Sequence, residues 1–249
     1  NEQTKESNIS LIATIVSPVG KTIKQTQKSL KLGANGSTTD SQSVTVSDPA
    51  LWSIETPKLY KAITEIRLGN EIVERVETNF VIRGIRFDAA NGFTLNDKRV
   101  ILKGGCIHHD NGPLGAAAFD RAEERKIELL KEAGYNAIRI SHNPPSKQLL
   151  DACDRIGMLV INQAFDMWEL PKNPQDYHLY FRDWWQKDLH SIISRDRNHP
   201  SIIMWSIGNE IYEAPDSAGY RMAKQLMEEV HRLDPTRPAS AAMVFLPPY

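Results

Sequence analysis

Two hydrophobic periods divide the chain near residue 85. Before that point apolar and polar residues alternate, for example over residues 9–15, and this period of two is typical of half-buried strands. A second alternating run over residues 60–68 meets a Gly-Asn pair and a further apolar run, which predicts a hairpin. Val44-Thr45-Val46 indicates another strand in the polar stretch between these runs. About 85 residues of short strands with turns favour a small antiparallel sandwich of immunoglobulin-like size.

From residue 93 onward, strands alternate with helices, the order required by a parallel sheet that helices cover. Residues 93–102 first predict a hairpin, whose return strand continues toward Cys106. Further strands are expected at 137–140, 158–161 and 202–207. Helices are expected from Asp120 to a stop at Gly134, from Ser146 to a stop at Gly157, around 184–193 and over 217–233. The pattern indicates four strand–helix units and the start of a fifth.

The length of these units, about 35 to 45 residues, and the absence of a glycine-rich nucleotide loop favour an eight-unit barrel over a doubly wound sheet. A complete barrel takes about 250 residues, but residues 86–249 number only 164. We therefore expect an immunoglobulin-like β-sandwich at 1–85, followed at 86–249 by an incomplete (β/α)8 TIM barrel of about four βα units. Because a half barrel has open parallel edges, it is expected to self-associate, for example as a symmetric homo-oligomer.

Composition and charge describe an ordinary soluble globular protein. The chain has 30 Lys and Arg against 31 Asp and Glu, a net charge of −1, so it offers no basic field for nucleic acid and no polybasic patch for a membrane. Its apolar runs are far shorter than the roughly 20 residues of a membrane-spanning helix. The two cysteines, Cys106 and Cys153, make neither a disulfide framework nor a zinc-like spacing.

Candidate chemistry follows from the barrel, where functional groups stand at the C-terminal ends of the strands. The four strand ends carry His108, His109 and Asp110; Arg139 and residues 141–145; Asn162, Gln163, Asp166 and Trp168; and Asn209 and Glu210. Residues 196–200 precede the fourth strand at the opposite face, so we interpret them as structural.

Glu210 is the sharpest candidate, since it follows a buried strand that closes in Gly208, where backbone can approach a ligand. Partial desolvation there would keep the carboxylic acid protonated, as a general acid requires. A rim carboxylate paired with Arg139 or Arg197 explains the position equally well. The neighbouring Asn209 is suited to hydrogen-bond a sugar hydroxyl, or to serve as a cap or turn residue.

Each of the other candidates also has both a functional and a structural interpretation. His108, His109 and His142 are more often hydrogen-bonded structural residues than catalysts, and they lack the His-x-x-x-His spacing of a helical metal site. Arg139 is suited to bind substrate or to orient a carboxylate. Trp168 is suited to stack on a sugar face or to pack inside the fold.

At these residues the chain resembles glycoside hydrolase family 2, the β-galactosidases, β-glucuronidases and β-mannosidases. Four stretches carry the resemblance: Leu51-Trp52 with residues 57–60; residues 95–98 leading to 102–105 and His108; residues 136–144; and residues 196–201 running through 205–210. Each stretch alone is a weak signal. Their order and spacing together are highly specific across nearly the whole chain.

The resemblance implies a retaining exo-β-glycosidase in which Glu210 is the general acid/base. It further implies that Asn209 holds the sugar 2-hydroxyl, that His108 and His142 contact the sugar, and that Arg139 lies near the nucleophile. A retaining enzyme needs two carboxyl groups about 5 to 5.5 Å apart. In the family the nucleophilic glutamate lies on a later strand, beyond residue 249, and a jelly-roll domain precedes the sandwich. The chain by itself is therefore expected to be inactive.

Asn162-Gln163 departs from the family, where many members carry an acidic pair, and we transfer no magnesium site or other cofactor. Gly208 and the order of residues 165–168 favour a β-galactosidase-like branch. A β-glucuronidase, a β-mannosidase and a non-catalytic carbohydrate-binding relic of the same scaffold remain alternatives. The expected partner is a β-glycoside, and the resemblance implies a soluble protein of the bacterial periplasm or cytoplasm.

Overall fold

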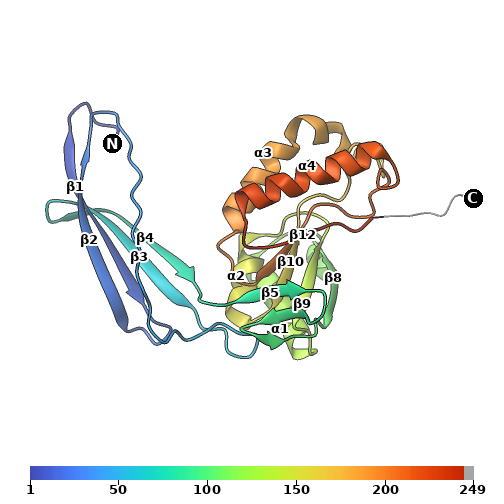
Figure 1. Ribbon diagram of the computed structural model, residues 1–249, viewed down its shortest axis with the longest axis horizontal. Coiled ribbons are helices and arrows are strands. Elements are labelled where there is room, and N and C mark those ends of the chain that lie inside the picture. Colours follow the sequence, from blue (N-terminus) through green and yellow to red (C-terminus); the bar gives the residue numbers. More distant parts are fainter. Residues whose placement is uncertain (244–249) are drawn as a thin grey trace, which may run out of the picture. The chain divides into compact units, whose positions relative to one another are not determined.

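A computed structural model of the chain describes residues 1–243, which form two compact units (Figure 1). Residues 1–53 and 58–83 make the first unit. The second unit begins at Gly84 and also includes residues 54–57. An antiparallel β domain followed by parallel β/α units is the fold class that the two hydrophobic periods predict.

The first unit is built on one four-stranded antiparallel sheet. Its strands are β1 (Ser7–Val16), β2 (Thr22–Leu32), β3 (Tyr60–Leu68) and β4 (Glu71–Phe80), in the order β2-β1-β3-β4. The expected hairpin is present, because β3 and β4 pair from Tyr60 opposite Phe80 to Leu68 opposite Glu71. Gly69 makes its turn at φ 61°, a left-handed conformation that favours glycine.

The strand expected at residues 44–46 is not formed. Residues 37–47 contain no strand, and Val44 and Val46 instead line a hollow of about 430 Å³ together with Ile15 and Phe80. This irregular segment covers part of one sheet face with apolar side chains. The alternating pattern therefore marked the half-buried side chains correctly, although it could not show that the backbone has no neighbouring strand to pair with.

The second unit contains the parallel sheet and its helices. Its sheet runs β12-β11-β10-β9-β8, made of β8 (Gly104–His108), β9 (Ala137–Ser141), β10 (Leu159–Gln163), β11 (Ile202–Ser206) and β12 (Ala239–Ser240). Between these strands lie α1 (Asp120–Glu132), α2 (Lys147–Ile156), α3 (His178–Asp196) and α4 (Ser217–Leu233). The short strands β5 (Ile85–Asp88), β6 (Gly92–Leu95) and β7 (Lys98–Arg99) precede β8, and a 3₁₀ turn (Gly112–Leu114) follows it. Four strand–helix units and the start of a fifth are thus confirmed.

The helix boundaries have local causes. Ser146 Oγ accepts a hydrogen bond from the Leu149 N–H at 3.2 Å and so caps α2, as predicted. Gly157 ends α2 at φ 79°, and a Cβ there would lie 2.4 Å from the Ile54 carbonyl oxygen. Glycine is therefore required twice at this stop, by its backbone conformation and by a close backbone contact.

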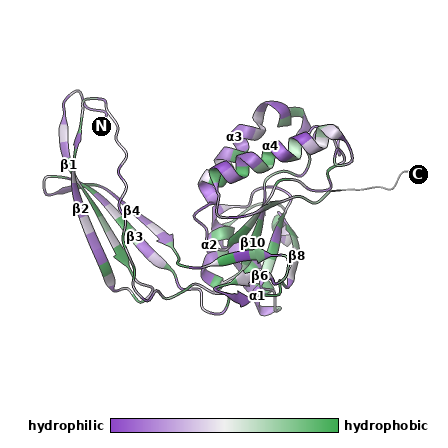
Figure 2. Ribbon diagram, viewed as in Figure 1, coloured by the Kyte–Doolittle hydropathy of each residue, from purple (hydrophilic) through white to green (hydrophobic). Residues whose placement is uncertain are grey.

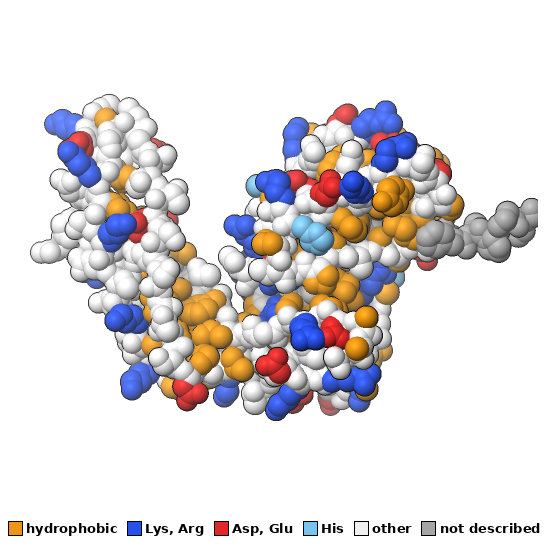
Figure 3. Space-filling model, viewed as in Figure 1, with side chains coloured by type: hydrophobic (Ala, Val, Ile, Leu, Met, Phe, Trp, Pro, Cys, Tyr) orange, Lys and Arg blue, Asp and Glu red, His pale blue; other side chains and the backbone are white. Residues whose placement is uncertain are grey.

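Apolar strands and helix faces form the core of the second unit. Figure 2 shows the strands of the parallel sheet as largely hydrophobic, while α3 and α4 mix both kinds of residue. Trp205, Leu150 and Ile193 are almost completely buried between sheet and helices. In Figure 3 positive and negative side chains are interspersed over this unit's visible face. No helix within residues 1–243 has both the length and the apolar character needed to cross a bilayer.

Polar side chains of α2, α3 and the segment before β11 join the helices to the strands. Asp196, at the end of α3, is fully buried and accepts hydrogen bonds from Asn162 Nδ2 at 2.9 Å and from Arg195. His199 Nδ1 lies 2.7 Å from Asp154 Oδ2, and Asp154 Oδ1 accepts the Ser201 N–H at 3.0 Å. These contacts support the structural interpretation of residues 196–200.

One group in the described part of the chain, Asp151, Asp154 and His199, has a spacing that could hold a metal ion. Its geometry is that of an internal hydrogen-bond cluster, because Asp154 already receives the imidazole and a backbone N–H. The group lies ahead of β11, away from the strand ends that carry the candidate chemistry.

Candidate active site

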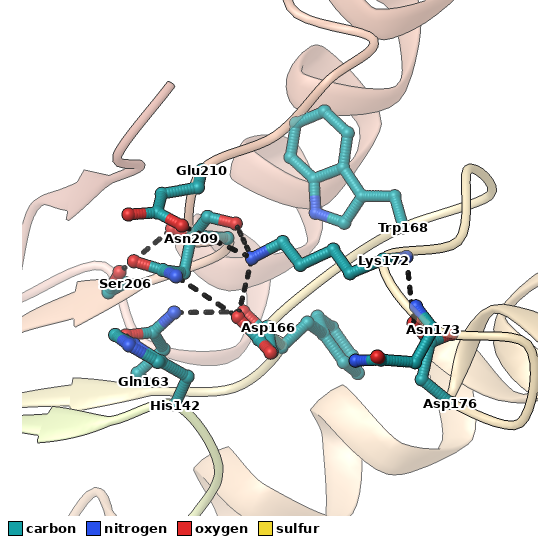
Figure 4. Close-up of polar contacts among 12 residues, drawn as sticks. His142, Gln163, Asp166, Trp168, Lys172, Asn173, Asp176, Ser206, Asn209 and Glu210 are labelled. Atoms are coloured by element: carbon teal, nitrogen blue, oxygen red, sulfur yellow. Dashed lines mark hydrogen bonds and ion pairs between the residues drawn. The ribbon is translucent and has the colours of Figure 1, made fainter. Parts of the chain in front are cut away.

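The carboxyl ends of three neighbouring strands bring most of the candidate residues together. β9 supplies Arg139 and, just past its end, His142; β10 ends at Gln163; and β11 is followed by Asn209. Figure 4 shows this arrangement, with His142 beside Gln163 and with Asn209 and Glu210 nearby. Parallel strands carry their C-terminal ends to one rim, which is why residues 70 positions apart in sequence meet here.

Hydrogen bonds determine which nitrogen of His142 carries a proton. Gln163 Nε2 donates to the Phe165 carbonyl at 2.9 Å, so its Oε1 is the atom that faces His142 Nδ1 at 3.1 Å. An amide oxygen only accepts, so Nδ1 carries the hydrogen and Nε2 is left as an acceptor in the neutral ring. The His108 ring stands perpendicular to the His142 ring, with centroids 5.2 Å apart.

The Asn209 amide is oriented from both sides. Arg139 Nη1 and Nη2 both donate to Asn209 Oδ1 at 3.2 Å, and Asn209 Nδ2 donates to Asp166 Oδ1 at 3.0 Å. A guanidinium can only donate and a carboxylate oxygen accepts, so the amide cannot flip without losing all three bonds. The second Nδ2 hydrogen has no acceptor within residues 1–243, and the residue is only 4% exposed.

Glu210 differs from the expectation of a partly desolvated acid. Its side chain is 67% exposed, and its backbone has φ 46°, the left-handed region that non-glycine residues rarely adopt. Neither expected arginine pairs with it, because Arg139 binds Asn209 and Arg197 donates to the Leu233 carbonyl. The cation near its carboxylate is Lys172, whose Nζ lies 4.0 Å from Glu210 Oε2.

Two side chains expected at this rim lie inside the fold. Trp168 is fully buried, and its Nε1 donates to the Ile207 carbonyl at 2.8 Å, so it packs and does not stack on a ligand. Asn162 turns to the outer side of the sheet, where it binds Asp196.

Gly208 also has a packing role. A Cβ at Gly208 would lie 2.7 Å from the Ile211 side chain and 3.0 Å from Trp168 Nε1. The close packing of these two side chains is therefore a second reason for glycine at this position, beside the expected approach of a ligand.

His109, the remaining histidine of the candidate set, links two loops. Its Nε2 lies 3.1 Å from the Asn143 carbonyl oxygen, which connects the segment after β8 to the segment after β9. This contact gives His109 the structural role that its type most often has.

The sequence interpretation missed Lys172 and the turn that holds it. Asp176 Oδ2 accepts the backbone N–H groups of Lys172 at 2.8 Å and Asn173 at 2.7 Å, and Asp176 Oδ1 accepts the N–H of His178 at 3.0 Å. Aspartate commonly accepts the backbone N–H two residues further on, and this local Asx turn is the sequence signal that could have indicated an ordered turn at residues 172–176.

Asp176 should make the stability of this turn depend on pH. Desolvation alone would raise the pKa of Asp176, but hydrogen bonds from Asn173, His178 and Lys172 outweigh it and lower the pKa from 3.8 to about 2. A carboxyl whose pKa is lower in the folded state stabilises that state above about pH 4, and the contribution is lost as the pH falls toward 2. We therefore expect Asp176→Asn to lower the melting temperature at neutral pH and to lower it much less near pH 2.

Thermal denaturation at several pH values would measure this difference. Asp183→Asn, which removes an exposed carboxylate from the same helix, is the matched control and should change the melting temperature little at either pH. A constant difference between wild type and Asp176→Asn from pH 7 to pH 2 would contradict the proposed contribution.

Comparison with known proteins matches both units of the chain to the same family. The model for the TIM barrel domain of glycosyl hydrolases family 2 matches residues 88–244, and a second model of glycosyl hydrolases family 2 matches residues 1–83. Beta-galactosidase BoGH2A of Bacteroides ovatus is 39% identical over 272 aligned positions, which cover 97% of this chain and 32% of that protein.

Two solved structures are also similar. A glycosyl hydrolase family 2 member from Bacteroides cellulosilyticus superimposes with a TM-score of 0.91 at 48% identity, covering 96% of this chain and 31% of that one. A β-glucuronidase of Bacteroides uniformis gives a TM-score of 0.87 at 31% identity, covering 98% of this chain and 30% of that one. The chain thus spans about a third of the length of these relatives.

Proposed function

Because this chain belongs to glycosyl hydrolase family 2, we propose that it carries the acid/base half of the active site of a retaining exo-β-glycosidase. The observation that supports this most directly is the pair Asn209 and Glu210 at the end of β11. Asn209 is held by Arg139 and Asp166 with one N–H left to donate, and Glu210 follows it with an exposed carboxyl group.

In the proposed reaction Glu210 acts twice. As an acid it gives its proton to the glycosidic oxygen while a second carboxylate attacks the anomeric carbon, so that the leaving alcohol departs and a glycosyl-enzyme ester forms. As a base it then takes a proton from water, whose oxygen attacks the same carbon and releases the second carboxylate. The free Nδ2 hydrogen of Asn209 is suited to a sugar hydroxyl acceptor, and the Nε2 lone pair of His142 to a hydroxyl donor.

The second carboxyl group is proposed to come from a longer polypeptide that contains this chain. The similar proteins are about three times as long, and a retaining site needs two carboxyl groups about 5 to 5.5 Å apart. On this proposal the 249-residue chain alone does not turn over substrate. The sheet edges at β8 and β12 have no neighbouring strand within residues 1–243, which supports self-association of the isolated chain.

A terminal β-galactoside is the proposed substrate, supported by the similarity to the Bacteroides ovatus β-galactosidase. A β-glucuronide is the second candidate, supported by the similarity to the Bacteroides uniformis β-glucuronidase. The missing nucleophile and the Asn162-Gln163 pair favour a third reading, a non-catalytic carbohydrate-binding relic of the same scaffold. That reading loses part of its support, because Asn162 binds Asp196 away from the rim and Gln163 orients His142.

A panel of nitrophenyl β-glycosides tests the proposal on the full-length protein. We expect the galactoside to be hydrolysed fastest, with the β-configured sugar as the first product seen by NMR, and we expect no turnover by the 249-residue chain. Fastest hydrolysis of the glucuronide would favour the second candidate. An α-configured first product, or binding of sugars without any turnover, would refute a retaining glycosidase.

A further inference from the structure

Lys172 is a charged side chain at the candidate site that no sequence motif announced. It lies in the loop between β10 and α3, and its side chain is only 13% exposed. The ammonium group of a lysine usually remains in contact with water. A nearly buried lysine is therefore expected to form hydrogen bonds or ion pairs that replace this hydration.

Three oxygen atoms from the candidate site surround the Lys172 ammonium. Nζ donates to Asp166 Oδ1 at 2.7 Å and to the Asn209 carbonyl oxygen at 2.8 Å, and it lies 4.0 Å from Glu210 Oε2. Figure 4 shows the extended Lys172 side chain ending among these three groups. The same Asp166 oxygen also accepts from Asn209 Nδ2 at 3.0 Å. One cation therefore links the carboxylate that orients Asn209, the peptide after Asn209, and the carboxylate of Glu210.

The contact with the Asn209 carbonyl bears directly on Glu210. That carbonyl belongs to the peptide bond leading into Glu210, whose φ of 46° is unfavourable for a residue with a Cβ. Holding the peptide oxygen holds the plane of this bond, and with it the direction in which the Glu210 side chain leaves the backbone. A residue in this conformation persists only where its surroundings determine it.

The backbone that carries Lys172 is also held in place. Asp176 accepts the backbone N–H groups of Lys172 and Asn173 and closes the turn onto the start of α3. A fixed backbone lowers the conformational entropy lost when the Lys172 ammonium is placed between Asp166 and Asn209.

We propose that Lys172 is a positioning residue for the acid/base glutamate, acting through the Asn209 carbonyl and the Glu210 carboxylate. This inference rests on the proposed function. When Glu210 gives its proton to the leaving oxygen it becomes an anion, and the ammonium 4.0 Å away stabilises that charge at the moment it forms. Loss of the ammonium should therefore slow reactions in which the leaving group needs that proton, and affect others little.

The test compares leaving groups in the full-length protein. For the sugar that the protein hydrolyses fastest, kcat/KM is measured with phenol and with 2,4-dinitrophenol as leaving groups, because kcat/KM reports the steps up to leaving-group departure. We expect Lys172→Met to lower kcat/KM for the phenyl glycoside at least about tenfold more than for the dinitrophenyl glycoside, and Lys172→Arg to recover part of the loss. Lys224→Met removes an exposed lysine from α4 and should change neither value.

Two results would overturn the proposal. An equal loss with both leaving groups would mean that Lys172 only supports the fold, and no loss would mean that it has no part in positioning Glu210. If Lys172→Met does not fold, Lys172→Gln keeps a donor without the charge and must show the same leaving-group dependence. A failure of the proposed function can be told apart from a failure of this inference. If Glu210 is not the acid, Glu210→Gln will lower kcat/KM equally for both leaving groups even though Lys172 is intact.

Discussion

Glu210→Gln in the full-length protein is expected to lower kcat/KM for a phenyl β-glycoside by about 10²- to 10⁴-fold, the usual contribution of general acid catalysis. Glutamine keeps the size of the side chain but has no proton to give to the glycosidic oxygen. The 2,4-dinitrophenyl glycoside should lose much less, since its leaving group departs as a stable anion. Steady-state kinetics with both substrates measures the difference.

Glu228→Gln is a well-matched control for this change. The Glu228 side chain, on α4, is 66% exposed, against 67% for Glu210, and it should affect neither substrate. An equal loss with both leaving groups after Glu210→Gln would show that Glu210 gives no proton to the leaving oxygen. With the 2,4-dinitrophenyl glycoside, whose departure needs no proton from the protein, azide should replace the base-activated water in Glu210→Ala, raise kcat and give a β-configured glycosyl azide.

The second large effect is on stability. Trp168→Ala is expected to lower the free energy of unfolding by about 3 to 5 kcal/mol, the usual cost of removing a buried aromatic side chain. Trp168 is fully buried, packs near Gly208 and donates its Nε1 hydrogen to the Ile207 carbonyl. Urea denaturation of the wild-type and variant chains, followed in parallel, measures the loss.

Trp184→Ala separates burial from residue type. Trp184 lies on α3 with 48% of its surface exposed, so its removal should cost far less than the removal of Trp168. Comparable losses for the two variants would argue against a packing role specific to Trp168. A raised KM with unchanged stability after Trp168→Ala would restore the sugar-stacking interpretation.

Much of the fold could be predicted because its signals are local. The alternation over β3 and β4, the Ser146 cap and the Gly157 stop each act within a few residues, and the structure confirms all three. The segment at 44–46 shows the limit of such signals. Whether an extended segment pairs with a neighbouring strand depends on which backbone lies beside it, and no local pattern contains that information.

The candidate site was predicted in part for a similar reason. Asn162 and Gln163 are adjacent on β10, and neighbouring strand residues point to opposite faces of the sheet. Only one of them could face His142, and the sequence did not show which. Lys172 was missed because its partners, Asp166 and Asn209, are brought to it by the fold of the loop between β10 and α3.

The sequence by itself determined the order of strands and helices, the family, and the strand ends at which polar groups gather, because periodicity, caps and motifs are properties of neighbouring residues. Only the tertiary structure decided which of those groups meet. It turned Asn162 outward, buried Trp168 behind Gly208, left Glu210 exposed and set the Lys172 ammonium beside it. The physical reason is that these contacts join residues brought together by the packing of separate strands and loops, where distance along the chain no longer predicts distance in space.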